Sequence, residues 1–165
     1  MDLEGEFGGK KGQLKVAEFL LRHGIRVSAD GGLFAGGVEL AYAKVGAVVG
    51  VDRRVVVGAV EEILKKPLLV DIFTRISTTP LLRDAAGALG YGALEIVPKD
   101  ASASGIIAGV TRIVADAGIS VRQVIADDPM FTDARLLIVT SKPVPRDLID
   151  VVLKVEGVKE VVVLA

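Results

Sequence analysis

The C-terminal half of the chain takes its fold from one stretch, ALEIVPKDASASGIIAGVTRIVADAGISVRQVIA, at residues 93–126. The spacing of its apolar residues changes along the way. Residues 93–97 form a short apolar run typical of a strand, whereas the apolar residues of 106–117 recur at three- and four-residue steps, which indicates a helix. Residues 119–126 again favour a strand. The stretch therefore predicts one β-α-β unit.

The residues that follow predict a second unit of the same kind. A strand is expected at 136–140, a helix at 146–155 and a strand at 158–164. The resulting order is β-α-β-β-α-β, and each helix has one apolar face. Both helices can therefore cover one side of a four-stranded sheet, the ferredoxin-like arrangement. Asp127 and Asp128 lie between the middle strands, where turn roles are favoured over metal ligation because nothing nearby completes a site.

Upstream of this pattern the sequence predicts helices. They are expected at residues 10–23, 39–49, 52–66, 68–76 and 81–89, with a turn or brief strand at 31–36. Residues 1–9 predict a flexible tail, residues 10–90 an all-helical domain, and residues 91–165 the second domain, with the boundary near Gly90. The fold class is therefore α+β.

The helices predicted at 39–49 and 52–66 are joined by a very short turn. Gly50 can adopt the positive φ that such a turn requires, and Asp52 suits the N-cap of the second helix. A helix, a glycine turn and a capped helix form a helix-turn-helix-like arrangement. Arg53 and Arg54 occupy the first turn of the second helix, where such motifs contact DNA. Two packed helices with a solvated arginine face are the alternative interpretation.

Composition narrows the function classes. The chain has 165 residues, a net charge of −1 and no cysteine, which excludes disulfides and thiolate metal sites. Its apolar runs are too short for a membrane span, and no signal peptide is evident, so we expect a cytoplasmic protein without membrane contact. The single histidine, His23, has no identifiable partner, and no catalytic motif is present. We therefore expect no enzymatic activity and no cofactor.

Three parts of the C-terminal pattern resemble the opening of an ACT domain. They are residues 95–100 (EIVPKD), residues 104–108 (SGIIA), and the helix that ends at Gly118 together with the strand residues 119–123 (ISVRQ). Residues 50–56 (GVDRRVV) together with residues 119–129 resemble an archaeal family of predicted regulators of amino-acid metabolism, which join a helix-turn-helix-like region to a C-terminal ACT domain. The resemblance covers nearly the whole length of the chain.

The resemblance implies a ligand site between the first strand and first helix of the domain. ACT domains bind amino acids or other small metabolites there, generally between two copies. Free N–H groups at a helix start favour a carboxylate, and an acidic residue can meet an ammonium group. Ser104 departs from the family, where proline often precedes the glycine. The implied ligand-binding residues are Asp100, Ser102, Ser104, Gly105, Ile106, Ile107 and Gln123.

These observations predict a non-catalytic regulator that senses an amino acid or related metabolite. Transcriptional control through the helical domain would make DNA a second partner. The alternative is a dimerising scaffold with no small-molecule ligand. In either case residues 119–126 are expected to form a sheet edge rich in β-branched residues, which favours a homodimer or larger homo-oligomer.

Overall fold

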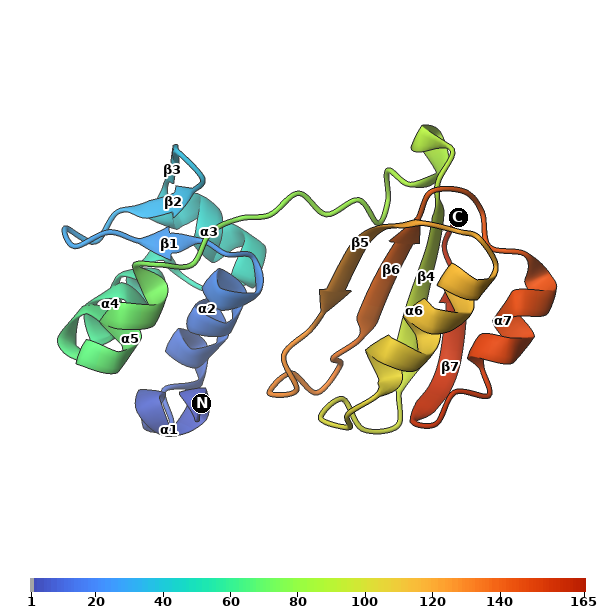
Figure 1. Ribbon diagram of the computed structural model, residues 1–165. Helices are drawn as coiled ribbons and strands as arrows, with labels where there is room; N and C mark the ends of the chain where they lie inside the picture. Colours follow the sequence, from blue (N-terminus) through green and yellow to red (C-terminus); the bar gives the residue numbers. More distant parts are fainter. Residues whose placement is uncertain (1) are drawn as a thin grey trace. The chain divides into compact units, whose positions relative to one another are not determined.

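The computed structural model describes residues 2–165, and the chain divides into two compact units after Pro80 (Figure 1). The predicted boundary near Gly90 is therefore ten residues too late. Residues 81–91, which we call the connector, belong to the C-terminal unit because Ala86 is fully buried against its sheet, with Leu82 and Tyr91 packed beside it.

The N-terminal unit contains helices and a small antiparallel sheet of order β1-β2-β3. The helices are α1 (Leu3–Phe7), α2 (Lys11–Arg22), α3 (Tyr42–Val49), α4 (Arg53–Lys65) and α5 (Pro67–Phe73), and the strands are β1 (Arg26–Val27), β2 (Leu33–Ala35) and β3 (Val38–Leu40).

Three predictions for this unit are wrong. It is not all-helical, because β1, β2 and β3 pair with one another, and the helix predicted from residue 39 begins only at Tyr42. The tail predicted at residues 1–9 contains helix α1. Asp2 caps that helix by accepting a hydrogen bond from the Gly5 N–H, and Leu3 and Phe7, one helical turn apart, are both buried.

The turn between α3 and α4 has the predicted local chemistry. Gly50 adopts a φ of 77°, and the Asp52 carboxylate accepts a hydrogen bond from the Arg54 N–H at 2.8 Å. Gly46 allows the helices to approach closely, because a Cβ at this position would lie 2.8 Å from the Val51 carbonyl oxygen. The apolar stripe of α4 is buried as expected through Val56, Ala59, Val60 and Ile63.

The C-terminal unit has the predicted β-α-β-β-α-β order. Its elements are β4 (Gly92–Pro98), α6 (Ile106–Asp116), β5 (Val121–Ala126), β6 (Leu136–Thr140), α7 (Arg146–Val152) and β7 (Val158–Val163). The sheet is antiparallel, with strand order β5-β6-β4-β7, so β5 is an edge strand as predicted. The helix predicted at 81–89 is not formed. The connector contains only a short 3-10 helix, η1 (Gly87–Leu89).

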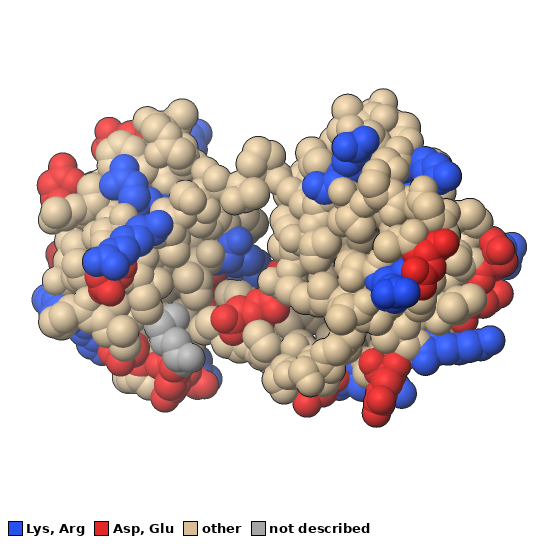
Figure 2. All heavy atoms as spheres, viewed as in Figure 1, with Lys and Arg blue, Asp and Glu red and all other residues tan. Residues whose placement is uncertain are grey.

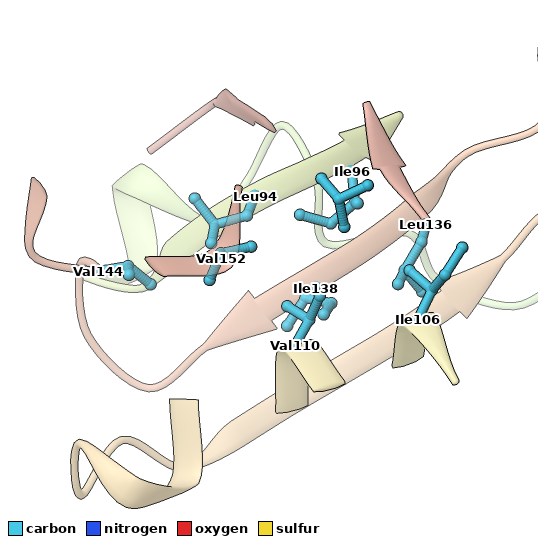
Figure 3. Close-up of a cluster of buried hydrophobic side chains, with 9 residues drawn as sticks. Leu94, Ile96, Ile106, Val110, Leu136, Ile138, Val144 and Val152 are labelled. Carbon is cyan, nitrogen blue, oxygen red and sulfur yellow. The ribbon is translucent and has the colours of Figure 1, made fainter. Parts of the chain in front are cut away.

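Both helices lie over one face of this sheet (Figure 1). Figure 3 shows Ile138 of β6 next to the helix residue Val110 and Leu94 of β4 next to the helix residue Val152, with Ile96 of β4 in the same cluster. Each such fully buried aliphatic side chain stabilises the fold by about 1.5–3 kcal/mol relative to an exposed one. The opposite, helix-free face presents the buried residues Ala93, Leu137 and Val139, which the connector covers.

Candidate functional site

The loop between β4 and α6 is organised around Asp100. Its Oδ1 atom accepts hydrogen bonds from the Ser102 N–H at 2.9 Å and from the Ser102 hydroxyl at 2.6 Å. The Lys99 N–H donates to the Gly157 carbonyl at 2.8 Å, which ties the loop to the start of β7. The loop that the sequence singled out is therefore a defined turn.

Gly105 ends this loop and forms the N-cap of α6. Its φ is 95°, a value that side-chain-bearing residues rarely adopt. No side chain among residues 2–165 caps the start of α6, and apart from the adjoining chain no described atom lies within 4 Å of the position that a Cβ at Gly105 would take. The space that a Gly105 side chain would occupy is therefore open, next to the first N–H groups of α6, which have no intrahelical partners.

The next two residues have different surroundings. Ile106 is buried, and its side chain lies against Gly157, where a Cβ would approach it to 3.0 Å. Ile107 is 44% exposed. The structure therefore brings Asp100, Ser102, Ser104, Gly105 and Ile107 into one short surface segment, with Ile106 as the anchor that holds the helix start on the core.

The Asp100 carboxyl is biased toward its charged form. The hydrogen bonds from the Ser102 side chain and then the Ser102 backbone lower its pKa below the ordinary value, since both stabilise the carboxylate. Asp100 is therefore a negative charge at neutral pH. Its Oδ1 atom serves the turn, so Oδ2 is the atom suited to accept from an incoming cation.

Gln123 is not brought to this segment. It pairs with Val139 on β6, which in turn pairs with Ala93 near the start of β4, whereas the loop follows Pro98 at the other end. Five residues of strand separate the two levels, about 17 Å at roughly 3.3 Å per residue. The side chain of Gln123 accepts a hydrogen bond from the Leu82 N–H at 2.9 Å, so it binds the connector.

Arg53 and Arg54 are both exposed in the first turn of α4, next to the capping carboxylate of Asp52. Asp30 and Arg53 both act electrostatically on Tyr42, whose pKa is raised, first by burial and then by Asp30. On the face drawn in Figure 2, cationic and anionic side chains are interspersed, and no broad area of either sign is visible.

A further polar cluster was not predicted from the sequence. Glu95, in the middle of β4, is a buried carboxylate, and its Oε2 atom accepts from the Arg135 Nη1 atom at 2.8 Å and from the Arg83 Nη2 atom at 3.4 Å. The two arginines lie 12 and 40 residues away in sequence, so no local motif links the three side chains. The one available signal was a charged residue within an apolar strand.

The two aspartates between β5 and β6 have the turn roles that were favoured for them. Asp128 Oδ1 accepts from the Met130 N–H at 2.9 Å, and Asp127 Oδ2 accepts from the Arg135 N–H at 3.1 Å. Within residues 2–165, no three His, Asp or Glu side chains gather closely enough to hold a metal ion. Nor does the described part of the chain contain a helix both long and apolar enough to cross a membrane.

Comparisons with known proteins add little to this picture. No protein-family model matches the chain, and no curated protein matches it. A solved structure described as the crystal structure of PH0061 is similar at 13% sequence identity, over 93% of this chain and 89% of that chain, with a TM-score of 0.27. A similarity at that level supports no conclusion about function.

Proposed function

We propose that this protein is a non-catalytic regulator that binds an amino acid or a related small metabolite at the loop between β4 and α6. The observation that carries the proposal is the open space beside Gly105, at a helix start that no described side chain caps. The resemblance of residues 91–165 to ACT domains also favours this segment.

The chemistry of the segment suits a ligand that carries both charges. A carboxylate would accept from the first N–H groups of α6, where the helix dipole also favours negative charge. An ammonium group would meet the charged Asp100 carboxylate in a charge-assisted hydrogen bond. The exposed Ile107 side chain offers apolar contact to an aliphatic ligand side chain.

Thermal denaturation of the full chain with each of the twenty amino acids tests the proposal. A ligand that binds only the folded state stabilises it by about 2.7 kcal/mol at a hundredfold excess over its dissociation constant. We expect a raised midpoint with one amino acid or a chemically related group of them. No shift with any of the twenty would favour the scaffold described below.

Asp100→Asn locates the site. Asparagine keeps an oxygen that can accept from Ser102 but loses the charge, so the loop should persist while the ligand affinity falls about tenfold or more. Asp116→Asn is the matched control, because Asp116 lies at the far end of α6, where it pairs with Arg112 at 2.9 Å. Equal losses in both variants would place the site elsewhere.

A dimerising scaffold is the second candidate, and the position of β5 favours it. This strand is an edge of the sheet, and its Val124 side chain is 40% exposed. An exposed β-branched edge is a template for pairing with another strand. A homodimer formed through β5 is compatible with either function, and only the ligand screen separates them.

DNA binding by the N-terminal unit is a further part of the proposed regulator. The capped start of α4 and the exposure of Arg53 and Arg54 support it. The adjacent Asp52 carboxylate opposes phosphate binding, so we expect weak binding that a dimer strengthens by doubling the contacts. An anisotropy titration with mixed duplex DNA at low salt tests this part.

A further inference from the structure

The connector lies on the helix-free face of the C-terminal sheet and is held there chiefly by side chains. The Leu82 N–H donates to Gln123 Oε1 at 2.9 Å, and Arg83 reaches Glu95 at 3.4 Å. The Arg122 guanidinium lies 5.6 Å from the centre of the Tyr91 ring. Within residues 81–91, no residue pairs with a strand of the sheet, so the connector is attached to the sheet without being part of it.

The connector is also compact in itself. The Leu89 N–H donates to the Ala85 and Ala86 carbonyls, and the Tyr91 N–H donates to the Ala86 carbonyl at 2.9 Å. These hydrogen bonds all join residues within the segment from Ala85 to Tyr91. It would therefore move as one piece and keep these backbone bonds.

The contact between Glu95 of β4 and Arg83 of the connector is the ion pair that joins the connector to the sheet. A buried carboxylate needs a cationic partner, because an unpaired buried charge is costly. Arg135, which precedes β6, supplies the shorter contact at 2.8 Å, and Arg83 supplies the longer one. The Arg83 Nε atom is buried and has no hydrogen-bond partner among the described residues. If Arg83 leaves, Glu95 stays paired with Arg135 and the Arg83 Nε–H gains water.

The apolar contacts under the connector are small. Ala86 is its one fully buried residue, with Leu82 and Tyr91 partly buried beside it. The other face of the sheet is covered by α6 and α7, which bury the larger side chains Ile106, Val110 and Val152. Segments with few buried apolar contacts open at lower free energy than the core.

We propose that the connector is a strap that detaches from the sheet while the β-α-β-β-α-β core stays folded, with the Arg83–Glu95 contact as its latch. Detachment exposes Ala93, Leu137 and Val139 and frees the chain between Pro80 and β4. It is thus a built-in conformational switch of the C-terminal unit. This inference does not depend on the proposed function, and its test needs no ligand.

A single thiol reports the opening, because the natural chain contains no cysteine. Ala86→Cys places the thiol under the connector, and Val110→Cys places one in the core beneath α6; both positions are fully buried. Each full-length variant is reacted with a thiol reagent under native conditions. We expect the thiol at position 86 to react at least about tenfold faster than the thiol at position 110, which only global unfolding exposes.

The latch is tested by adding Arg83→Ala to both thiol variants. We expect labelling at position 86 to accelerate about tenfold, as for loss of one charge-assisted hydrogen bond, and to remain at least about tenfold faster than labelling at position 110, because the contact stabilises the closed state against both opening and global unfolding. Glu160→Gln is the matched control, because this carboxylate is exposed and lies on β7, where it pairs with Val97 of β4. It should change neither rate.

Equal, slow labelling at both positions would overturn the proposal and make the connector part of the core, and unchanged labelling at position 86 in the Arg83→Ala variant would overturn the latch. If Ala86→Cys does not fold, hydrogen exchange of the natural protein decides. The amide of Leu82, whose bond to Gln123 is broken by detachment, should then exchange faster than the amides of α6 and β6. Exchange at the same rate as the core would overturn the proposal equally.

Discussion

Replacing either of two glycines on α6 with leucine should separate ligand binding from stability. Gly105 and Gly109 lie four residues apart, at the start and in the first turns of the same helix. At Gly105 the added side chain would enter open space, whereas at Gly109 a Cβ would lie 2.7 Å from Val155 Cγ1. The same substitution therefore meets two opposite environments.

The structure gives the expected cost at Gly105. A side chain at positive φ costs about 1–2 kcal/mol, and reduced freedom of the unfolded chain offsets about 0.4–1 kcal/mol of this. We expect Gly105→Leu to lose about 1 kcal/mol of unfolding free energy, a small part of the roughly 5–15 kcal/mol that a domain has. The variant should stay folded but lose amino-acid binding, because leucine would fill the space beside the N–H groups.

Gly109→Leu should do the reverse. Leucine has a better helix propensity than glycine, which adds up to about 1 kcal/mol to the unfolding free energy. Forcing a whole side chain against the β-branched Val155 costs more, so we expect a net loss of about 3 kcal/mol of unfolding free energy. Urea denaturation measures both stabilities, and calorimetric titration measures binding to whatever stays folded. If Gly105→Leu were as destabilising as Gly109→Leu, or bound ligand unchanged, the reasoning about this site would be refuted.

Three further predictions concern other parts of the chain. Val124→Lys should convert the expected homodimer to a 17.2 kDa monomer by light scattering, because a charge on the β5 edge blocks strand pairing; a natural protein that is already monomeric would remove the premise. Replacing both Arg53 and Arg54 with alanine should weaken any DNA binding and reduce its salt slope by about 0.9 per lost phosphate contact, and unchanged binding would show that these arginines are not the contacts. The pKa of His23 should lie below 6.5, because burial and then Arg22 lower it. The unfolded chain then binds the proton more readily, so stability should fall as the pH drops below 6.5, and a proton NMR titration of this single histidine that gave a higher pKa would contradict the expectation.

The C-terminal unit was largely predictable from sequence because its elements are long enough for their periodicity to show. The apolar residues of α6 repeat over three turns, and β6 is an apolar run closed by Thr140 and buried throughout. The α3–α4 turn was predictable for a different reason. Glycine is the residue type that favours the positive φ found at Gly50, and aspartate is a preferred N-cap, the role that Asp52 has in α4.

The small sheet of the N-terminal unit was predicted only in part, as a turn or brief strand at residues 31–36 where β2 lies, because its strands are only two or three residues long. No periodicity can be read over so few residues, and β3 continues directly into the pattern of α3. The short helix α1 did have a signal, since Leu3 and Phe7 are spaced by four and Asp2 can cap. Five residues are too few for a stable helix by themselves, so tertiary burial decides their structure.

The connector was mistaken for a helix because Leu82, Ala86 and Leu89 have helical spacing. Its actual shape is set by contacts with distant residues, above all the bonds from Leu82 to Gln123 and from Arg83 to Glu95. Gln123 was placed in the ligand site because the resemblance to ACT domains implied it, whereas its bond to Leu82 joins residues 41 positions apart in the sequence. Because β5 runs parallel to β4, its first residues lie at the end of the sheet opposite the loop between β4 and α6.

The central place of β4 in its sheet sets an order of events during synthesis. Leu94 pairs with Ile138 of β6 and with Val163 of β7. The strand β4 is therefore synthesised first in this unit, but it is fully paired only after β7, the last strand, has left the ribosome. The N-terminal unit is built mostly from neighbours in sequence, such as the β2–β3 pair and the α3–α4 pair, and contacts of that kind form early. We therefore expect the nascent chain to carry a finished N-terminal unit while Leu94 and Ile96 still lack strand partners, the interval in which a chain of this design is most exposed to aggregation.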